Sequence, residues 1–203
     1  MVKSILRSIL PRSYLPGVYV RKRTGMQVMG GCFAGLSYVG DAVGSALIPK
    51  LLGTYERELG PVVDEIVRGS FEEIIDIGAA EGYYAVGLAR LLPDARVHAF
   101  EMTEHGRALL SEMAIANGVA DRVLIKGKCD APDLRDCLGS SERPVVICDV
   151  EGHEGKLLDI GLVPSLVRAF VLVEIHETLC PGVGQLLSSS FADSKAVRER
   201  PGG

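Results

Sequence analysis

The fold is decided by residues 74–82, which read Ile74-Ile75-Asp76-Ile77-Gly78-Ala79-Ala80-Glu81-Gly82. The first four residues form an apolar run broken by one acid, which is typical of a buried β-strand, and the glycines after it favour a tight turn. A helical pattern follows, and a second strand over 95–101 ends on Glu101. This unit predicts the nucleoside half-site of an open α/β sheet, in which the turn backbone lies under the ligand and the acid holds two ribose hydroxyls.

Strand and helix signals continue to alternate after this unit. Further strands are expected over 123–125, 144–150 and 170–175, with helices between them and one more over 183–191. The strands are continuous apolar runs, which indicates that both of their faces are covered. The chain is therefore predicted to have an α/β fold with a doubly wound, Rossmann-like, mostly parallel sheet of at least five strands.

The chain is expected to fall into three regions. Residues 1–45 are predicted to be an irregular lead-in, because prolines and glycines interrupt any long pattern. Residues 46–70 show apolar residues at helical spacing, and residues 71–203 form the ligand-binding domain.

Composition excludes several classes of function. The 203 residues include 22 basic and 26 acidic ones, a net charge of -4, so a nucleic-acid partner is not expected. The five cysteines are odd in number and include no C-x-x-C pair, which argues against a disulfide framework or zinc site and favours a cytoplasmic location. Residues 26–48 are weakly apolar after three basic residues, but Asp41 and five glycines argue against a membrane span.

Polar residues are expected to meet at the carboxyl edge of the sheet, where ligands bind in such folds. The turn reads G-x-x-x-G rather than G-x-G-x-x-G, so no pyrophosphate site is indicated. Glu81 within it would repel phosphates and suits a ligand with a positive end, such as S-adenosylmethionine. Glu101 would then bind the ribose, and Asp130 would accept from the adenine amino group.

These residues resemble the class I S-adenosylmethionine-dependent methyltransferases and, within them, the FkbM family. The likeness covers roughly residues 71–187, and its sharper part is Asp149-Val150-Glu151-Gly152-His153-Glu154, with Val173-Glu174-Ile175-His176 on the next strand. The resemblance implies that Asp149 and Glu151 face the transferred methyl. It implies cofactor contacts by Asp76, Gly78, Ala79, Glu81, Gly82, Glu101 and Asp130.

The implied reaction is an in-line displacement at the sulfonium methyl by a hydroxyl of a sugar or other small metabolite. A base must take the hydroxyl proton, and the candidates are Glu151, His153 and His176. His176 is the first choice, since an imidazole titrates near neutral pH. Glu154 is expected instead to stabilise a helix N-terminus. A metal site among Asp149, Glu151, Glu174 and His176 is not expected, because neighbours on one strand point to opposite faces.

Alternatives remain at several positions. Gly78 and Gly82 could serve only the turn, Glu101 could be a surface acid, and His176 could be a satisfied strand-end histidine. Relatives of this class usually add two strands after the fifth, and residues 192–203 do not provide them. Three explanations are open: the chain is truncated, a partner completes the sheet, or a bare edge supports a homodimer. A catalytically poor cofactor-binding protein and, less favoured, a nucleotide-dependent oxidoreductase therefore stay as alternative functions.

Overall fold

The computed structural model describes residues 14–139 and 141–192. The chain divides into two compact units, Met1–Glu65 and Ile66–Gly203. The division falls inside helix α4 (Gly60–Gly69), near the end of the region that the sequence predicted to be helical.

The first unit is more helical than the sequence suggested. It contains α2 (Tyr14–Thr24), α3 (Leu47–Leu52) and a 3₁₀ turn, η1 (Arg57–Leu59). The prediction of irregular structure over 1–45 is wrong for α2, because Pro16 lies in the first turn of the helix, where a proline displaces no hydrogen bond. Residues 25–45 consist of turns and bends with one isolated antiparallel bridge between Gln27 and Ser37, and residues 1–13 lie outside the described residues. Within the described part of the chain, no helix combines the length and apolar character needed to cross a membrane.

The second unit is built on a five-stranded parallel sheet, as predicted. Its strands are β1 (Glu73–Ile77), β2 (Arg96–Phe100), β3 (Val123–Lys126), β4 (Val145–Cys148) and β5 (Phe170–Val173). Their spatial order is β3-β2-β1-β4-β5, and every neighbouring pair is parallel. The chain winds outward from β1 in one direction and from β4 in the other, so the switch point lies between these two strands.

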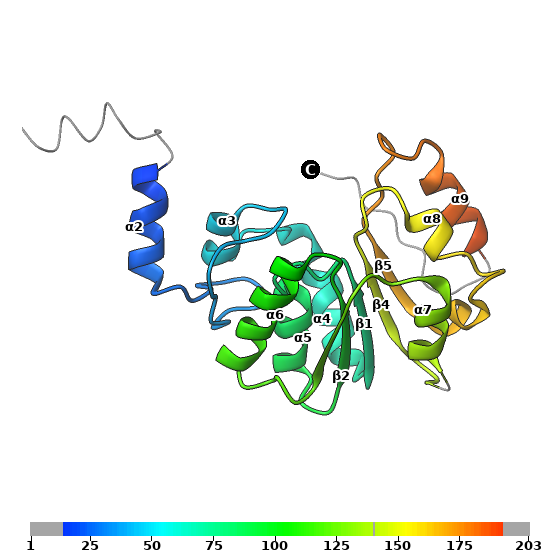
Figure 1. Ribbon diagram of the computed structural model, residues 1–203, viewed down its shortest axis with the longest axis horizontal. Coiled ribbons are helices and arrows are strands. Elements are labelled where there is room, and N and C mark those ends of the chain that lie inside the picture. Colours follow the sequence, from blue (N-terminus) through cyan, green and yellow to red (C-terminus); the bar gives the residue numbers. More distant parts are fainter. Residues whose placement is uncertain (1–13, 140, 193–203) are drawn as a thin grey trace, which may run out of the picture. The chain divides into compact units, whose positions relative to one another are not determined.

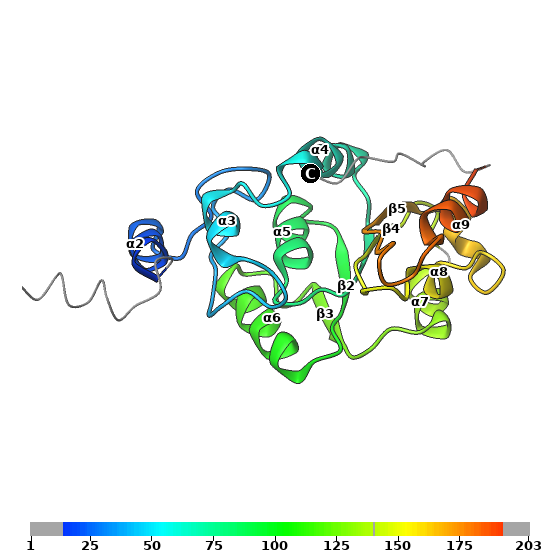
Figure 2. The ribbon, with the colours of Figure 1, turned by 90° about the horizontal axis from the view of Figure 1, so that it is seen from above.

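Helices cover both faces of this sheet (Figures 1 and 2). On one face lie α5 (Tyr83–Leu91) and α6 (Glu104–Ala116), and on the other lie α7 (Ala131–Leu138), α8 (Glu154–Leu157) and α9 (Val183–Ser190). Ile75 and Ile77 of β1 pack with Leu134 of α7 and Leu158 in one core cluster. Side chains alternate along a strand, so Ile74 and Asp76 point to the α5 side. This burial on both faces explains the continuous apolar strands.

His98 makes the stability of this unit depend on pH. It lies on β2, where its Nε2 is 3.1 Å from Glu73 Oε2 and its buried Nδ1 has no hydrogen-bond partner among the described residues. Burial, followed by the positive charge of Lys126, lowers the pKa of His98, although Glu73 acts in the opposite direction. The unfolded chain therefore takes up a proton at higher pH than the folded protein, and stability is lost as pH falls below about 6.5.

We expect the His98→Gln variant to lose less thermal stability than the parent between pH 7 and pH 5. Thermal unfolding midpoints across that range measure the slope. The exposed His105 on α6 provides the control, since His105→Gln should leave the slope unchanged. Equal slopes in the parent and in His98→Gln would contradict this account.

Candidate active site

The backbone amides of the turn after β1 donate hydrogen bonds to acceptors within the protein. The amides of Gly78 and Ala79 both donate to the carbonyl oxygen of Phe100, at 2.9 Å each, and that of Gly82 donates to Ala79 at 2.7 Å. The amide of Ala80 donates to Oε2 of Glu101 at 3.0 Å. An anion-binding turn presents free amides to its ligand, and these four are already engaged. The geometry agrees with the absence of a pyrophosphate motif.

Both glycines of the turn have a backbone conformation that other residues rarely adopt, and Gly78 is also required by the close approach of another backbone segment. They have φ values of 88° and 97°, in the left-handed region. A Cβ on Gly78 would lie 1.8 Å from the carbonyl oxygen of Asp149, at the end of β4, and one on Gly82 would lie 2.3 Å from Cδ1 of Leu110. The alternative that Gly78 and Gly82 serve only the turn therefore has a physical basis, because the fold alone explains these glycines.

Glu101 ties the end of β2 to the glycine turn. Besides the amide of Ala80, its carboxylate accepts from the amide of Thr103 at 2.7 Å and from the Thr103 hydroxyl at 2.6 Å. The side chain is buried, so it is not the ordinary surface acid of the alternative reading. A carboxylate offers about four acceptor positions, and three are used here. One acceptor position remains, which is fewer than the two ribose hydroxyls expected from the sequence would use.

The remaining predicted cofactor residues differ in their surroundings. Asp76 is buried, and Glu81 has no exposed surface at all. Contacts of these two side chains with a cofactor stay predictions. Asp130 is exposed and caps α7, where its Oδ1 accepts from the amide of Asp133 at 2.9 Å. Helix capping is sufficient to explain this aspartate locally. Its contact with an adenine stays a prediction.

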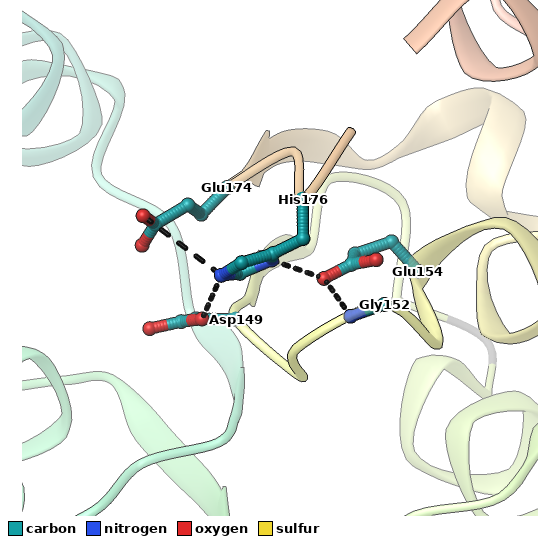
Figure 3. A network of polar contacts seen from close by, with 5 residues as sticks. All are labelled: Asp149, Gly152, Glu154, Glu174 and His176. Atoms are coloured by element: carbon teal, nitrogen blue, oxygen red, sulfur yellow. Dashed lines mark hydrogen bonds and ion pairs between the residues drawn. The ribbon is translucent and has the colours of Figure 1, made fainter. Parts of the chain in front are cut away.

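The ends of β4 and β5 bring three polar side chains together. Cys148 pairs with Val173, which places Asp149 beside Glu174 at the carboxyl edge, and His176 follows two residues later. Nε2 of His176 lies 3.7 Å from Oδ1 of Asp149 and 4.0 Å from Oε1 of Glu174. Figure 3 shows the imidazole between these two carboxylates on one side and Glu154 on the other. We call Asp149, Glu174 and His176 the edge cluster.

Glu154 holds His176 from the protein side. It is the first residue of α8, as the sequence predicted, and it is completely buried. Its Oε1 accepts from the amide of Gly152 at 3.0 Å and lies 2.7 Å from Nδ1 of His176. The sequence predicted only a helix-terminal role for Glu154. It did not predict the principal contact of this side chain, because His176 is 22 residues away along the chain.

The charges of this pair reinforce one another. Burial would lower the pKa of His176, but the hydrogen bond and charge of Glu154, together with Asp149 and Glu174, raise it above its usual value. Burial would raise the pKa of Glu154, but backbone hydrogen bonds from Gly152 and Glu154, together with His176, lower it. Both shifts favour an imidazolium beside a carboxylate.

The other predicted catalytic residues are placed differently. Asp149 lies at the end of the switch-point strand and is half exposed, as a residue facing a ligand should be. Glu151 is exposed and has a φ of 48°. Among the described polar contacts, none links Glu151 or His153 to the edge cluster. Of the three candidate bases, only His176 belongs to it.

The chain matches no protein-family model, and no curated protein matches it. Solved structures do resemble it. A precorrin-6y C5,15-methyltransferase of Geobacter metallireducens is 13% identical, with a TM-score of 0.50 over 76% of each chain. A methyltransferase of Podospora anserina with bound S-adenosylhomocysteine is 19% identical, with a TM-score of 0.47 over 71% of this chain and 68% of that one. An O-methyltransferase family protein of Burkholderia thailandensis is 16% identical, with a TM-score of 0.44 over 67% of this chain and 44% of that one.

At these identities the similarity concerns the fold. The parallel five-stranded sheet with helices on both faces is the Rossmann-like fold of class I methyltransferases, and the first of these structures supports that assignment.

Proposed function

We propose that the protein is an S-adenosylmethionine-dependent methyltransferase that acts on a hydroxyl of a small molecule, such as a sugar. The observation that carries the proposal is the position of Glu101, a buried acid at the end of β2 that is bonded to the glycine turn at Ala80. It retains an acceptor position for a ribose, beside a turn whose amides are unsuited to phosphates. A nucleoside cofactor without phosphates fits both features.

The acceptor would bind on the other side of the switch point, at the edge cluster. Methyl transfer from a sulfonium requires alignment and removal of the hydroxyl proton. Asp149 lies directly across the switch point from the turn, since its carbonyl oxygen opposes Gly78. Its Oδ1 lies 3.7 Å from Nε2 of His176, and this nitrogen is on the side of the ring that faces away from the buried Glu154. The edge cluster is therefore the proposed place of hydroxyl activation.

The finer parts of the proposal come from the sequence. The resemblance to the FkbM family is supported by the Asp149–Glu154 segment, which supplies both Asp149 and the partner of His176. The same proposal includes a role for Glu151 near the methyl, a cytoplasmic location and a homodimer through β5. It also includes cofactor contacts by Asp76, Gly78, Ala79, Glu81, Gly82 and Asp130. The fold itself does not select the acceptor.

Calorimetry tests the cofactor assignment. We expect S-adenosylmethionine and S-adenosylhomocysteine to bind and NAD not to bind. Glu101→Gln should weaken binding of both ligands by at least about tenfold, because the ribose then loses a charged hydrogen-bond acceptor. The exposed Glu104, three residues further on, provides the control, and Glu104→Gln should bind as the parent does.

Circular dichroism must show that Glu101→Gln remains folded, since this residue also supports the turn. Failure of the parent to bind either ligand would overturn the proposal, as would unchanged binding by a folded Glu101→Gln variant. Binding without methyl transfer to any tested hydroxyl compound would instead assign the protein to the catalytically poor alternative.

A further inference from the structure

Helix α2 of the first unit has one face that packs against its own unit. This face is partly buried and consists of Gly17, Val20, Arg21 and Thr24, which recur at helical spacing. A Cβ on Gly17 would lie 3.9 Å from Cδ1 of Ile48 in α3, and Arg21 forms an ion pair with Asp41. These contacts fix which side of the helix is turned away from the unit.

The opposite face of α2 is exposed and combines apolar and basic side chains. It consists of Val18, Tyr19, Lys22 and Arg23, and we call these four residues the outer face. The Tyr19 side chain is 68% exposed, and Val18 beside it is also exposed. Within the described part of the chain, neither Lys22 nor Arg23 forms an ion pair. A shallow hollow of about 230 Å³ is lined by Tyr19, Lys22 and Arg23.

The positive charge of α2 belongs to a cationic region of an otherwise acidic chain. Residues 1–24 contain six of the 22 basic residues and none of the 26 acidic ones. Before α2 the sequence alternates basic with large apolar residues, namely Lys3, Ile5, Leu6, Arg7, Ile9, Leu10 and Arg12. Separation of charge of this kind is typical of a segment that binds an anionic partner.

The helix dipole explains only part of this arrangement. Basic residues in the last turn of a helix stabilise its C-terminal end, and Arg21, Lys22 and Arg23 lie in that turn. The dipole does not explain why Val18 and Tyr19 remain exposed one turn earlier on the same face. It also does not explain the absence of acidic residues from the first 24 positions.

We propose that the outer face of α2 binds the surface of an anionic lipid bilayer. Lys22 and Arg23 would contact the negative headgroups. Tyrosine is favoured at the level of the headgroups, and an aliphatic side chain beside it gains by entering the boundary with the acyl chains. The helix would lie on the bilayer without crossing it.

A nucleic acid is the other polyanion to which two cations and an aromatic ring could bind. Its phosphates would attract Lys22 and Arg23, and a base could stack on Tyr19. Val18, however, would gain nothing from a phosphate backbone, whereas it gains from lipid. The combination of aliphatic, aromatic and basic side chains therefore favours the bilayer. The proposal concerns the first unit and does not depend on the methyltransferase assignment.

Cosedimentation of the whole chain with lipid vesicles tests the proposal. We expect binding to phosphatidylcholine vesicles that contain phosphatidylserine and little binding to vesicles of phosphatidylcholine alone. Binding should weaken as the salt concentration rises from about 0.1 M to about 0.5 M, because the headgroup charges are then screened. The double substitution Lys22→Gln with Arg23→Gln should reduce the partition coefficient by at least about tenfold.

The second unit provides a matched control for this double substitution. Lys128 and Arg135 are also an exposed lysine and an exposed arginine, so Lys128→Gln with Arg135→Gln changes the net charge equally. The control should bind vesicles as the parent does. All four side chains are exposed, so both double variants should remain folded, which circular dichroism verifies.

Tyr19→Trp reports whether the aromatic residue enters the lipid. The chain has no tryptophan, so this variant has a single indole whose emission reports only on the outer face. We expect its emission to shift to shorter wavelength when phosphatidylserine vesicles are added, because the ring leaves water for the headgroup region.

Absence of binding to phosphatidylserine vesicles would overturn the proposal. Equal binding to vesicles without phosphatidylserine, or equal losses in the two double variants, would also overturn it. An unchanged emission of Tyr19→Trp on bound vesicles would show that the outer face is not what contacts them. Tighter binding to single-stranded RNA than to the vesicles would replace the bilayer by a nucleic acid as the partner.

Discussion

Gly78→Ala should unfold or severely destabilise the second unit. The added Cβ would lie 1.8 Å from the carbonyl oxygen of Asp149, and the residue has a φ of 88°. Strain at that φ costs about 1–3 kcal/mol. The clash adds to it, because both partners are backbone at the ends of paired strands. We expect a total above about 3 kcal/mol, which lowers the melting temperature by roughly 10 °C in a chain of this size.

Gly118→Ala separates the clash from the strain. Gly118 also has a positive φ, 67°, but a Cβ there meets nothing within 4 Å. Its replacement should cost only about 1 kcal/mol. Thermal unfolding followed by circular dichroism measures both variants, with soluble yield as a second readout. Equal destabilisation by the two substitutions would show that the approach of β1 to Asp149 is not a tight constraint.

The close approach of Gly78 to the backbone of Asp149 also shows which part of the site the sequence could predict. The run at 74–82 is local, and its strand, turn and helix appear as expected because each depends on neighbouring residues. The turn was read as a ligand site, yet the space that Gly78 leaves is filled by Asp149, which is distant in sequence. A glycine pattern indicates close approach without indicating what approaches.

The edge cluster shows the opposite case. Each member ends or follows a predicted strand, so its presence at the carboxyl edge followed from the parallel sheet. That Asp149 lies beside Glu174 depends on the pairing of β4 with β5, and the contact of Glu154 with His176 depends on the start of α8. Sequence spacing fixes neither. The sequence offered one signal, which is that acids and a histidine follow both strands. Pairing the two strands with one another would have placed residues 149–154 beside residues 174–176.

The helix α2 was missed for a local reason. Pro16 was treated as a breaker, whereas a proline in the first turn is compatible with a helix. The error did not affect the site, since the sheet and its edge belong to the second unit.

Glu154→Ala is expected to destabilise the protein by about 2–4 kcal/mol, or roughly 5–15 °C in melting temperature. The change removes a completely buried carboxylate, leaves the amide of Gly152 without its acceptor, and leaves a cavity beside His176. The cost should stay below that of a fully buried ion pair, because the His176 side chain is 21% exposed and water can reach it.

Glu177→Ala is the matched control for this substitution. Glu177 also accepts from two backbone amides, those of Gly182 and Gly184, but it is exposed. Its removal should change the melting temperature much less, because water replaces both hydrogen bonds. Similar losses of stability in the two variants would show that burial does not account for the contribution of the Glu154 contacts to stability.

Glu154→Gln then separates the shape of this side chain from its charge. The amide has nearly the same shape and retains one oxygen for the amide of Gly152, so the variant should remain folded. It lacks the negative charge that helps to raise the pKa of His176, so that pKa should fall toward its usual value, which an NMR titration of the imidazole measures. A folded Glu154→Gln variant in which the pKa of His176 is unchanged would leave Glu154 with a purely structural role.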